Sequence, residues 1–231
     1  QETKTETERL GASYILISSI LHTVFGGIGL YQVATFFKFS KRSSLVASLV
    51  YMLSPKFAGF TEAGHFGLIA ASAWIPWVLY FLLNLLKEPK FSNTLRLSVS
   101  WLAIYLTHPV ISIWIALLSP IVYFSKIFFF GNHAFAKLVK QTLFFVLSVL
   151  FFLAIAAPSL FTQIEYRDEF TRDLLLSNRE VYPVWTYSQF AKSLIAPYLG
   201  SVFANSLDSE KWIALGLIPS ILVAAGFAFL T

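Results

Sequence analysis

The sequence of 231 residues contains no cysteine and little charge. Without cysteine there are no disulfide bonds and no thiolate chemistry, so the sequence carries no redox indication of its compartment. Charged residues make up 13% of the chain, against roughly 25% in a soluble globular domain. Hydrophobic residues make up 57%, and uncharged runs reach the ~20 residues that span a bilayer. The composition therefore predicts a membrane protein.

Uncharged runs separated by short charged loops predict an all-α fold, a polytopic transmembrane bundle of about seven membrane helices with helices in its outer loops. The expected spans are residues 10–37, 43–55, 66–86, 92–107, 109–128, 138–157 and 212–230. The second of these spans, residues 43–55, is short and can be extended to residue 60 only across Lys56.

The stretch from Leu97 to Ser125 carries no formal charge over 29 residues and is interrupted by His108 and Pro109. As one helix it would measure about 43 Å, longer than a hydrocarbon core of about 30 Å. A single span would also separate the lysines before it from those after it, whereas a hairpin places them on one side. We therefore predict two helices, with Pro109 in the first turn of the second.

The expected inner loops hold nine Lys and Arg side chains and one acid, Glu88. This asymmetry predicts a multi-pass protein of the cell membrane, with residues 158–210 outside the cytoplasm. The net charge of +5 does not indicate nucleic acid binding, because the cations lie in short loops between apolar runs. Membrane lipids are the expected surroundings.

The ends of the sequence resemble cuts. No basic region and apolar core mark a signal peptide at Gln1, and Thr231 follows an apolar run directly. We expect one transmembrane domain, residues 1–231, truncated at both ends.

Glu62 and His65 form the first candidate site. In one helical turn, residues three apart share a face, and this pair would suit a general base or two ligands of a divalent metal. The alternative is a polar turn in which His65 caps the next helix. No complete metal site is evident, so the metal requirement stays open.

His108, at the apex of the expected hairpin, is the second candidate. A neutral histidine can hydrogen-bond a substrate hydroxyl or phosphate. The alternative is a histidine that serves only the structure of the turn.

The outer segment combines dense charge with aromatic residues. Glu165, Arg179, Trp185 and Tyr187 are its candidates, because guanidinium binds phosphate bidentately and aromatic faces stack on sugars. The alternative is a solvated helix on the membrane surface.

The order of several motifs resembles the YfhO-like membrane proteins of the GT-C glycosyltransferase superfamily. The resemblance rests on GLYQVATFFKFSKRSSLVASLVYMLSPKFAGF, GHFGLIAASAWIPWVLYFLLNLLK, LTHPVISIWIALLSPIVYF, AAPSLFTQIEY, SNRE and APYLGS. It covers most of residues 14–201, with THP in place of the more usual GHP.

This resemblance implies a membrane transferase that moves a sugar from a polyprenyl-phosphate carrier to a glycan or lipid acceptor on the outer face. The family usually places a catalytic acid in its first outer loop, which is expected to precede Gln1. The family-like positions are Glu62 and His65, assigned as catalytic, and His108, Glu165, Ser177 and Arg179, assigned to substrate binding with Trp185 and Tyr187. The implied mechanism is inverting transfer, in which a carboxylate deprotonates the acceptor and Arg179 or a histidine stabilises the departing phosphate.

Two other functions stay open. Several helices with polar breaks also describe a transporter, and a non-catalytic membrane scaffold would need no catalytic acid at all.

Overall fold

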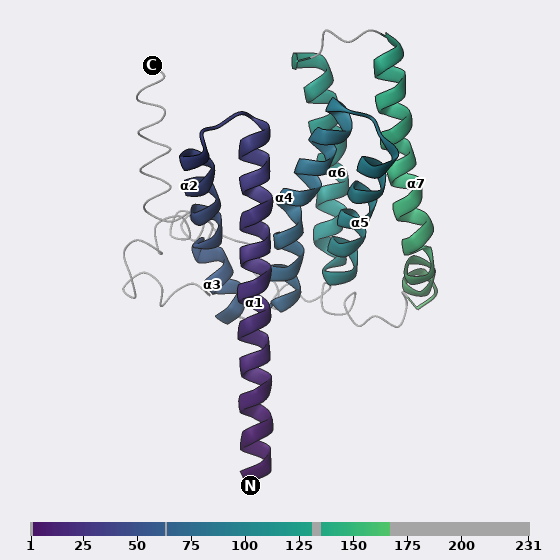
Figure 1. The fold of residues 1–231 in the computed structure, drawn as a ribbon. Helices are drawn as coiled ribbons and strands as arrows, with labels where there is room; N and C mark the ends of the chain where they lie inside the picture. The colour runs from purple at the N-terminus through teal and green to yellow at the C-terminus, as the bar shows by residue number, and fades with distance from the viewer. Residues whose placement is uncertain (1, 63, 131–134, 167–231) are drawn as a thin grey trace, which may run out of the picture.

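The computed structural model describes residues 2–62, 64–130 and 135–166, which form helices joined by short turns (Figure 1). No strand occurs in these ranges, so the expected all-α fold is confirmed for them. The helices are α1 Glu2–Phe36, α2 Lys41–Met52, α3 Pro55–Glu62, α4 Phe66–Lys87, α5 Phe91–Thr107, α6 Pro109–Phe130 and α7 Phe135–Glu165.

Three helical segments in the described part of the chain are long and apolar enough to cross a membrane: Ser13–Phe36 of α1, Phe66–Lys87 of α4 and Phe135–Glu165 of α7. A shorter apolar segment, Pro109–Ser125, lies in α6. The protein is thus a multi-pass membrane protein by the length and composition of its helices. The seventh expected span, residues 212–230, lies outside the described residues.

The predicted hairpin is confirmed. Helix α5 ends at Thr107, α6 begins at Pro109, and His108 between them has an extended backbone. Proline fits the first position of α6 because a backbone N–H group there would have no acceptor within the helix, so the N–H group that proline lacks is not missed.

The second expected span is instead two short helices. Helix α2 ends at Met52, and Pro55 begins α3. Proline disfavours a helical conformation at the residue before it, Ser54, so the chain breaks there. The 12 residues of α2 are about 18 Å long at the usual rise, too short to cross a bilayer alone.

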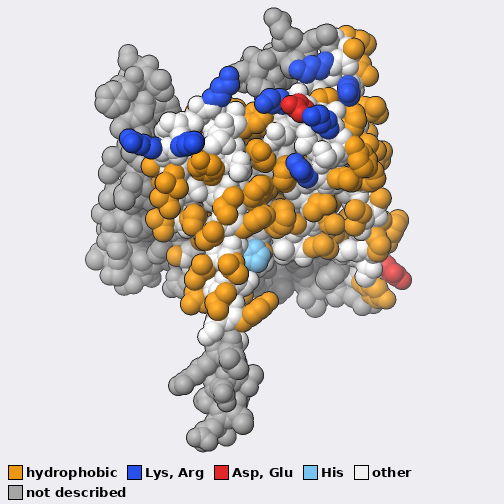
Figure 2. All heavy atoms as spheres, in the orientation of Figure 1, with side chains coloured by type: hydrophobic (Ala, Val, Ile, Leu, Met, Phe, Trp, Pro, Cys, Tyr) orange, Lys and Arg blue, Asp and Glu red, His pale blue; other side chains and the backbone are white. Residues whose placement is uncertain are grey.

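Helices α2 and α3 run in the same direction, and the other successive helices alternate, so that the α1–α2, α4–α5 and α6–α7 junctions lie at one end of the bundle (Figure 1). We call this the basic end, because Lys and Arg side chains gather there while hydrophobic side chains cover the middle of the visible face (Figure 2). The α3–α4 and α5–α6 turns lie at the opposite end, which we call the histidine end after His65 and His108.

Helix α4 packs against α1 on one side and α5 on the other. Glycines permit the close approach of α1, since a Cβ atom on Gly29 would lie 2.8 Å from Trp77 Nε1, and one on Gly26 would lie 3.0 Å from Ala73 Cα. Trp77 Nε1 donates a hydrogen bond to the Phe25 carbonyl oxygen at 3.0 Å. Small residues at a helix contact and hydrogen bonds between helices are the usual means of holding membrane helices together.

Helix α5 is rich in polar residues yet central, because it packs against α4, α6 and α7. Ser98 is buried and its hydroxyl lies 2.8 Å from the Ser148 carbonyl oxygen of α7. The buried Tyr105 donates to Ser159 Oγ of the same helix at 3.1 Å. The carbonyl and hydroxyl oxygens of α7 thus provide hydrogen-bond partners for the polar side chains of α5, which lipid cannot provide.

Candidate functional site

The turn between α3 and α4 contradicts the expected helical pairing of Glu62 and His65. Glu62 is the last residue of α3, and Gly64 follows with φ +75°, a left-handed conformation that ends the helix. His65 then occupies the N-cap position of α4, where its side chain makes no capping hydrogen bond. The two residues therefore belong to different elements. His65 is the N-cap residue of α4, as the alternative of a capping turn expected, but it caps through its carbonyl oxygen, which accepts from the Leu68 and Ile69 N–H groups.

His108 shapes the turn between α5 and α6. Its Nδ1 atom accepts a hydrogen bond from the Ile111 backbone N–H at 3.3 Å, so it caps α6. Because Nδ1 accepts, Nε2 is the ring nitrogen that can carry the proton and donate a hydrogen bond. His22, in contrast, donates from Nδ1 to the Ser18 carbonyl oxygen at 2.8 Å within α1.

Gly67 brings the two turns together. A Cβ atom at this position would lie 2.7 Å from the Thr107 carbonyl oxygen and 4.0 Å from His108 Cδ2. Only glycine allows the first turn of α4 to approach the backbone of α5 so closely. The structure therefore places the His65 and His108 turns side by side at the histidine end.

Glu165 is exposed at the end of α7, on a helix that continues past Pro158. The contact between Tyr105 and Ser159 holds this end of α7 against the end of α5. Glu165 thus lies at the same end of the bundle as His65 and His108 (Figure 1).

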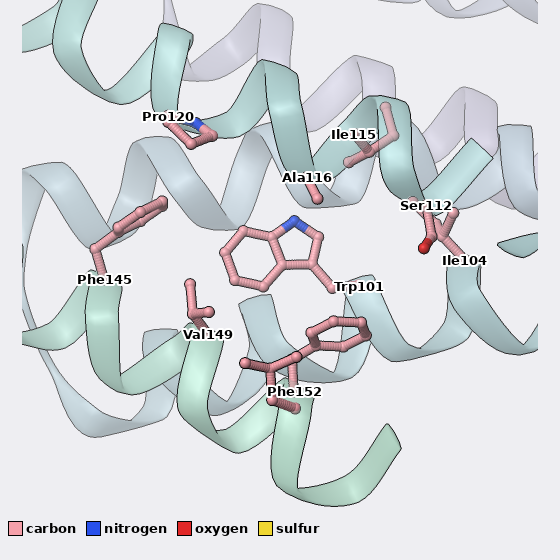
Figure 3. A pocket seen from close by; sticks show the side chains of 10 residues that line it. Trp101, Ile104, Ser112, Ile115, Ala116, Pro120, Phe145, Val149 and Phe152 are labelled. Atoms are coloured by element: carbon pink, nitrogen blue, oxygen red, sulfur yellow. The ribbon is translucent and has the colours of Figure 1, made fainter. Parts of the chain in front are cut away.

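An apolar cavity of about 270 Å³ lies between α5, α6 and α7. Trp101 of α5 points into it (Figure 3), and its Nε1 lies 3.3 Å from Ser119 Oγ. Ile104 and Ser112, each four residues from His108, line the part nearest the histidine end. The other lining residues are Ile115, Ala116, Pro120, Phe145, Val149, Phe152 and Leu153.

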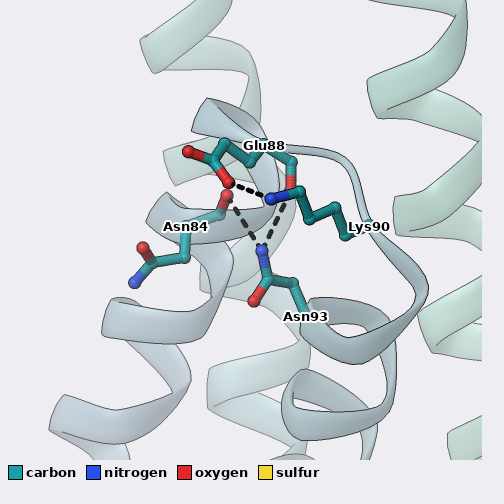
Figure 4. A network of polar contacts seen from close by, with 4 residues as sticks. All are labelled: Asn84, Glu88, Lys90 and Asn93. Carbon is teal, nitrogen blue, oxygen red and sulfur yellow. Dashed lines mark hydrogen bonds and ion pairs between the residues drawn. The ribbon is translucent and has the colours of Figure 1, made fainter.

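The basic end contrasts with this arrangement. Glu88 is its only acid in the described part of the chain, and Lys90 Nζ lies 2.6 Å from Glu88 Oε2 (Figure 4). The hydrogen bond from Lys90 and its charge hold the pKa of the Glu88 carboxyl below its usual value. The Asn93 amide donates to the Glu88 carbonyl oxygen at 2.9 Å and closes the α4–α5 turn.

Within residues 2–62, 64–130 and 135–166, no three His, Asp or Glu side chains are grouped so as to hold a metal ion. Ser177, Arg179, Trp185 and Tyr187 lie outside the described residues.

Neither Gly67 nor the cavity around Trp101 was predicted from the sequence. Gly67 could have been found from the sequence, because a small residue at the start of an apolar helix often marks a close contact between helices. No comparable signal marked the cavity, because apolar residues on α5, α6 and α7 suit lipid contact equally well.

Comparisons with protein families, with curated proteins and with solved structures found no match to this chain.

Proposed function

We propose that the chain is part of a GT-C-like membrane glycosyltransferase that moves a sugar from a polyprenyl-phosphate carrier to a glycan or lipid acceptor. In this proposal the bundle has about seven spans, and the histidine end and residues 158–210 face the outside of the cell. The motif order in the sequence and the charge difference between the two ends support this orientation.

The observation that carries the proposal is the position of the His108 turn at one end of an apolar cavity. Ser112 and Pro120, which line that cavity, are eight residues apart along α6, or about 12 Å at the usual rise. A polyprenyl phosphate joins a long apolar chain to an anionic group. The apolar polyprenyl chain suits the cavity around Trp101, and its phosphate group suits a hydrogen-bond donor at the His108 turn.

The proposed reaction inverts the configuration of the sugar. A carboxylate, with Glu62 as the candidate in this chain, takes the proton of the acceptor hydroxyl while the oxygen of that hydroxyl forms a bond to the anomeric carbon. The bond between that carbon and the phosphate oxygen breaks, and the phosphate leaves with the electron pair. His108 and Arg179 stabilise this charge.

The test measures release of polyprenyl phosphate from a polyprenyl-phosphate hexose by the intact protein in its native membranes, with mass spectrometry as the readout. His108→Asn keeps a side-chain oxygen able to cap α6 but loses the imidazole donor. We expect it to lower release by about 10²-fold, and we expect losses for Glu62→Gln and Arg179→Ala. His22→Ala is the matched control, because its ring bonds within α1.

Unchanged release in Glu62→Gln and Arg179→Ala would refute the assigned roles. Movement of a solute across vesicles containing the protein, without any release of polyprenyl phosphate, would favour the transporter.

A further inference from the structure

Arg96 is an exposed cation inside a helix of the bundle. It is the sixth residue of α5, which begins at Phe91, so it lies about 7 to 8 Å along the helix from the basic end. A charged side chain at this depth is costly in lipid unless it has a partner or reaches the interface, and such residues commonly mark a binding site.

No acid in the described part of the chain neutralises Arg96. The acid nearest in sequence, Glu88, is paired with Lys90 at 2.6 Å. The Arg96 guanidinium group takes part in no hydrogen bond or ion pair within the described ranges, and only the Arg96 carbonyl oxygen accepts a hydrogen bond, from Ser100 Oγ at 2.8 Å. Its charge is therefore available to an anion from outside these segments.

Arg96 lines a groove of about 360 Å³. We call it the Arg96 groove; its lining includes Phe25 of α1, Trp74, Trp77 and Phe81 of α4, and Val99 of α5. Because α4 packs against both α1 and α5, it forms the floor of this groove. Its lining is almost entirely apolar apart from Arg96.

The aromatic wall of the groove is fixed in place. The Phe25 ring stacks on Trp77 with centroids 5.1 Å apart, and Trp77 stacks on Phe81 at 5.7 Å. The hydrogen bond from Trp77 Nε1 to the Phe25 carbonyl oxygen holds the indole against α1. From Phe81 to Trp74 the wall extends seven residues along α4, or about 10 Å towards the middle of the membrane.

We infer that the Arg96 groove binds an anionic glycerophospholipid from the leaflet at the basic end. Arg96 binds the phosphate, for which guanidinium geometry is well suited, and one acyl chain lies along the aromatic wall. The choice of an anionic lipid follows from the unpaired charge of Arg96 and from the other cations at this end, since basic pockets between membrane helices select anionic head groups.

The test is native mass spectrometry of the purified full chain in mixed micelles that hold equal amounts of phosphatidylglycerol and phosphatidylcholine. We expect the wild type to retain phosphatidylglycerol preferentially and Arg96→Gln to lower that preference about tenfold. Lys137→Gln, an exposed cation in the first turn of α7, is the matched control and should keep the preference.

A second variant tests the groove without changing charge. Val99 is 49% exposed, so Val99→Trp can be accommodated in the fold while filling the groove, and we expect it to reduce retention of both lipids. The inference is overturned if Arg96→Gln keeps the wild-type preference, if the wild type retains both lipids equally, or if Val99→Trp leaves retention unchanged.

Discussion

Replacing Gly67 by alanine tests the contact that joins the two turns of the histidine end. The added Cβ atom would lie 2.7 Å from the Thr107 carbonyl oxygen, whereas ordinary contacts begin at 3.4 Å. Because the opposing atom belongs to the backbone, no side-chain rotation relieves the clash. Helices α4 and α5 must separate by about 0.7 Å at this point, or the backbone must distort.

The expected cost follows from two opposing effects. Overpacking of a close contact costs about 1–3 kcal/mol, while alanine is favoured over glycine by up to about 1 kcal/mol inside a helix. With about 2 kcal/mol, the middle of the range, for overpacking and up to about 1 kcal/mol gained from alanine, the net destabilisation is about 1–2 kcal/mol, which corresponds to a fall in Tm of roughly 2–8 °C for a chain of this size.

The assay is thermal unfolding in detergent, followed by circular dichroism. Gly11→Ala is the matched control, because Gly11 is also in a helix and a Cβ atom there meets nothing within 4 Å. We expect this control to leave Tm unchanged or to raise it slightly. Equal Tm values for Gly67→Ala and Gly11→Ala would refute the close contact between α4 and the end of α5.

Three further predictions concern hydrogen bonds. His108→Ala removes the cap of α6 and should lower stability by about 1 kcal/mol in thermal unfolding, whereas His108→Asn should restore it. Ser98→Ala removes a buried contact with α7 and should cost about 1 kcal/mol in denaturant unfolding; Thr162→Ala, whose exposed hydroxyl bonds only within α7, should cost less. Because the pKa of Glu88 is lowered in the folded protein, its ion pair with Lys90 contributes stability at pH values above the pKa of Glu88 in the unfolded chain. This contribution is lost as the pH falls through the pKa of Glu88 in the folded protein. Lys90→Gln should therefore raise the Glu88 pKa in an NMR titration, and an unchanged value would contradict the pairing.

The sequence predicted best those helices whose ends carry a strong local signal. The expected spans 66–86, 92–107 and 109–128 end within two residues of α4, α5 and α6, because charged loops and the His108–Pro109 pair mark their limits. The last described helix was harder, since α7 continues through Pro158 to Glu165. Proline is tolerated inside membrane helices when neighbouring groups satisfy the freed backbone carbonyl.

The site could be predicted only in its residues, and not in its arrangement. The spacing of Glu62 and His65 suits one helical turn, but Gly64 adopts a left-handed conformation that no spacing rule reveals. The proximity of the two turns depends on Gly67 meeting Thr107, 40 residues later in the chain. Such a contact follows from the packing of α4 on α5, which local sequence patterns do not encode.

The polar character of α5 has a consequence for the biosynthesis of the protein. A segment that carries Asn93, Arg96 and several serines gains little free energy by moving from the translocon into lipid without a partner helix. Its neighbours α4 and α6 are more apolar and therefore gain more from entering lipid, and α5 packs against both. We therefore expect α5 to enter the bilayer as the middle of a three-helix unit, so that its insertion must wait until α6 has been synthesised.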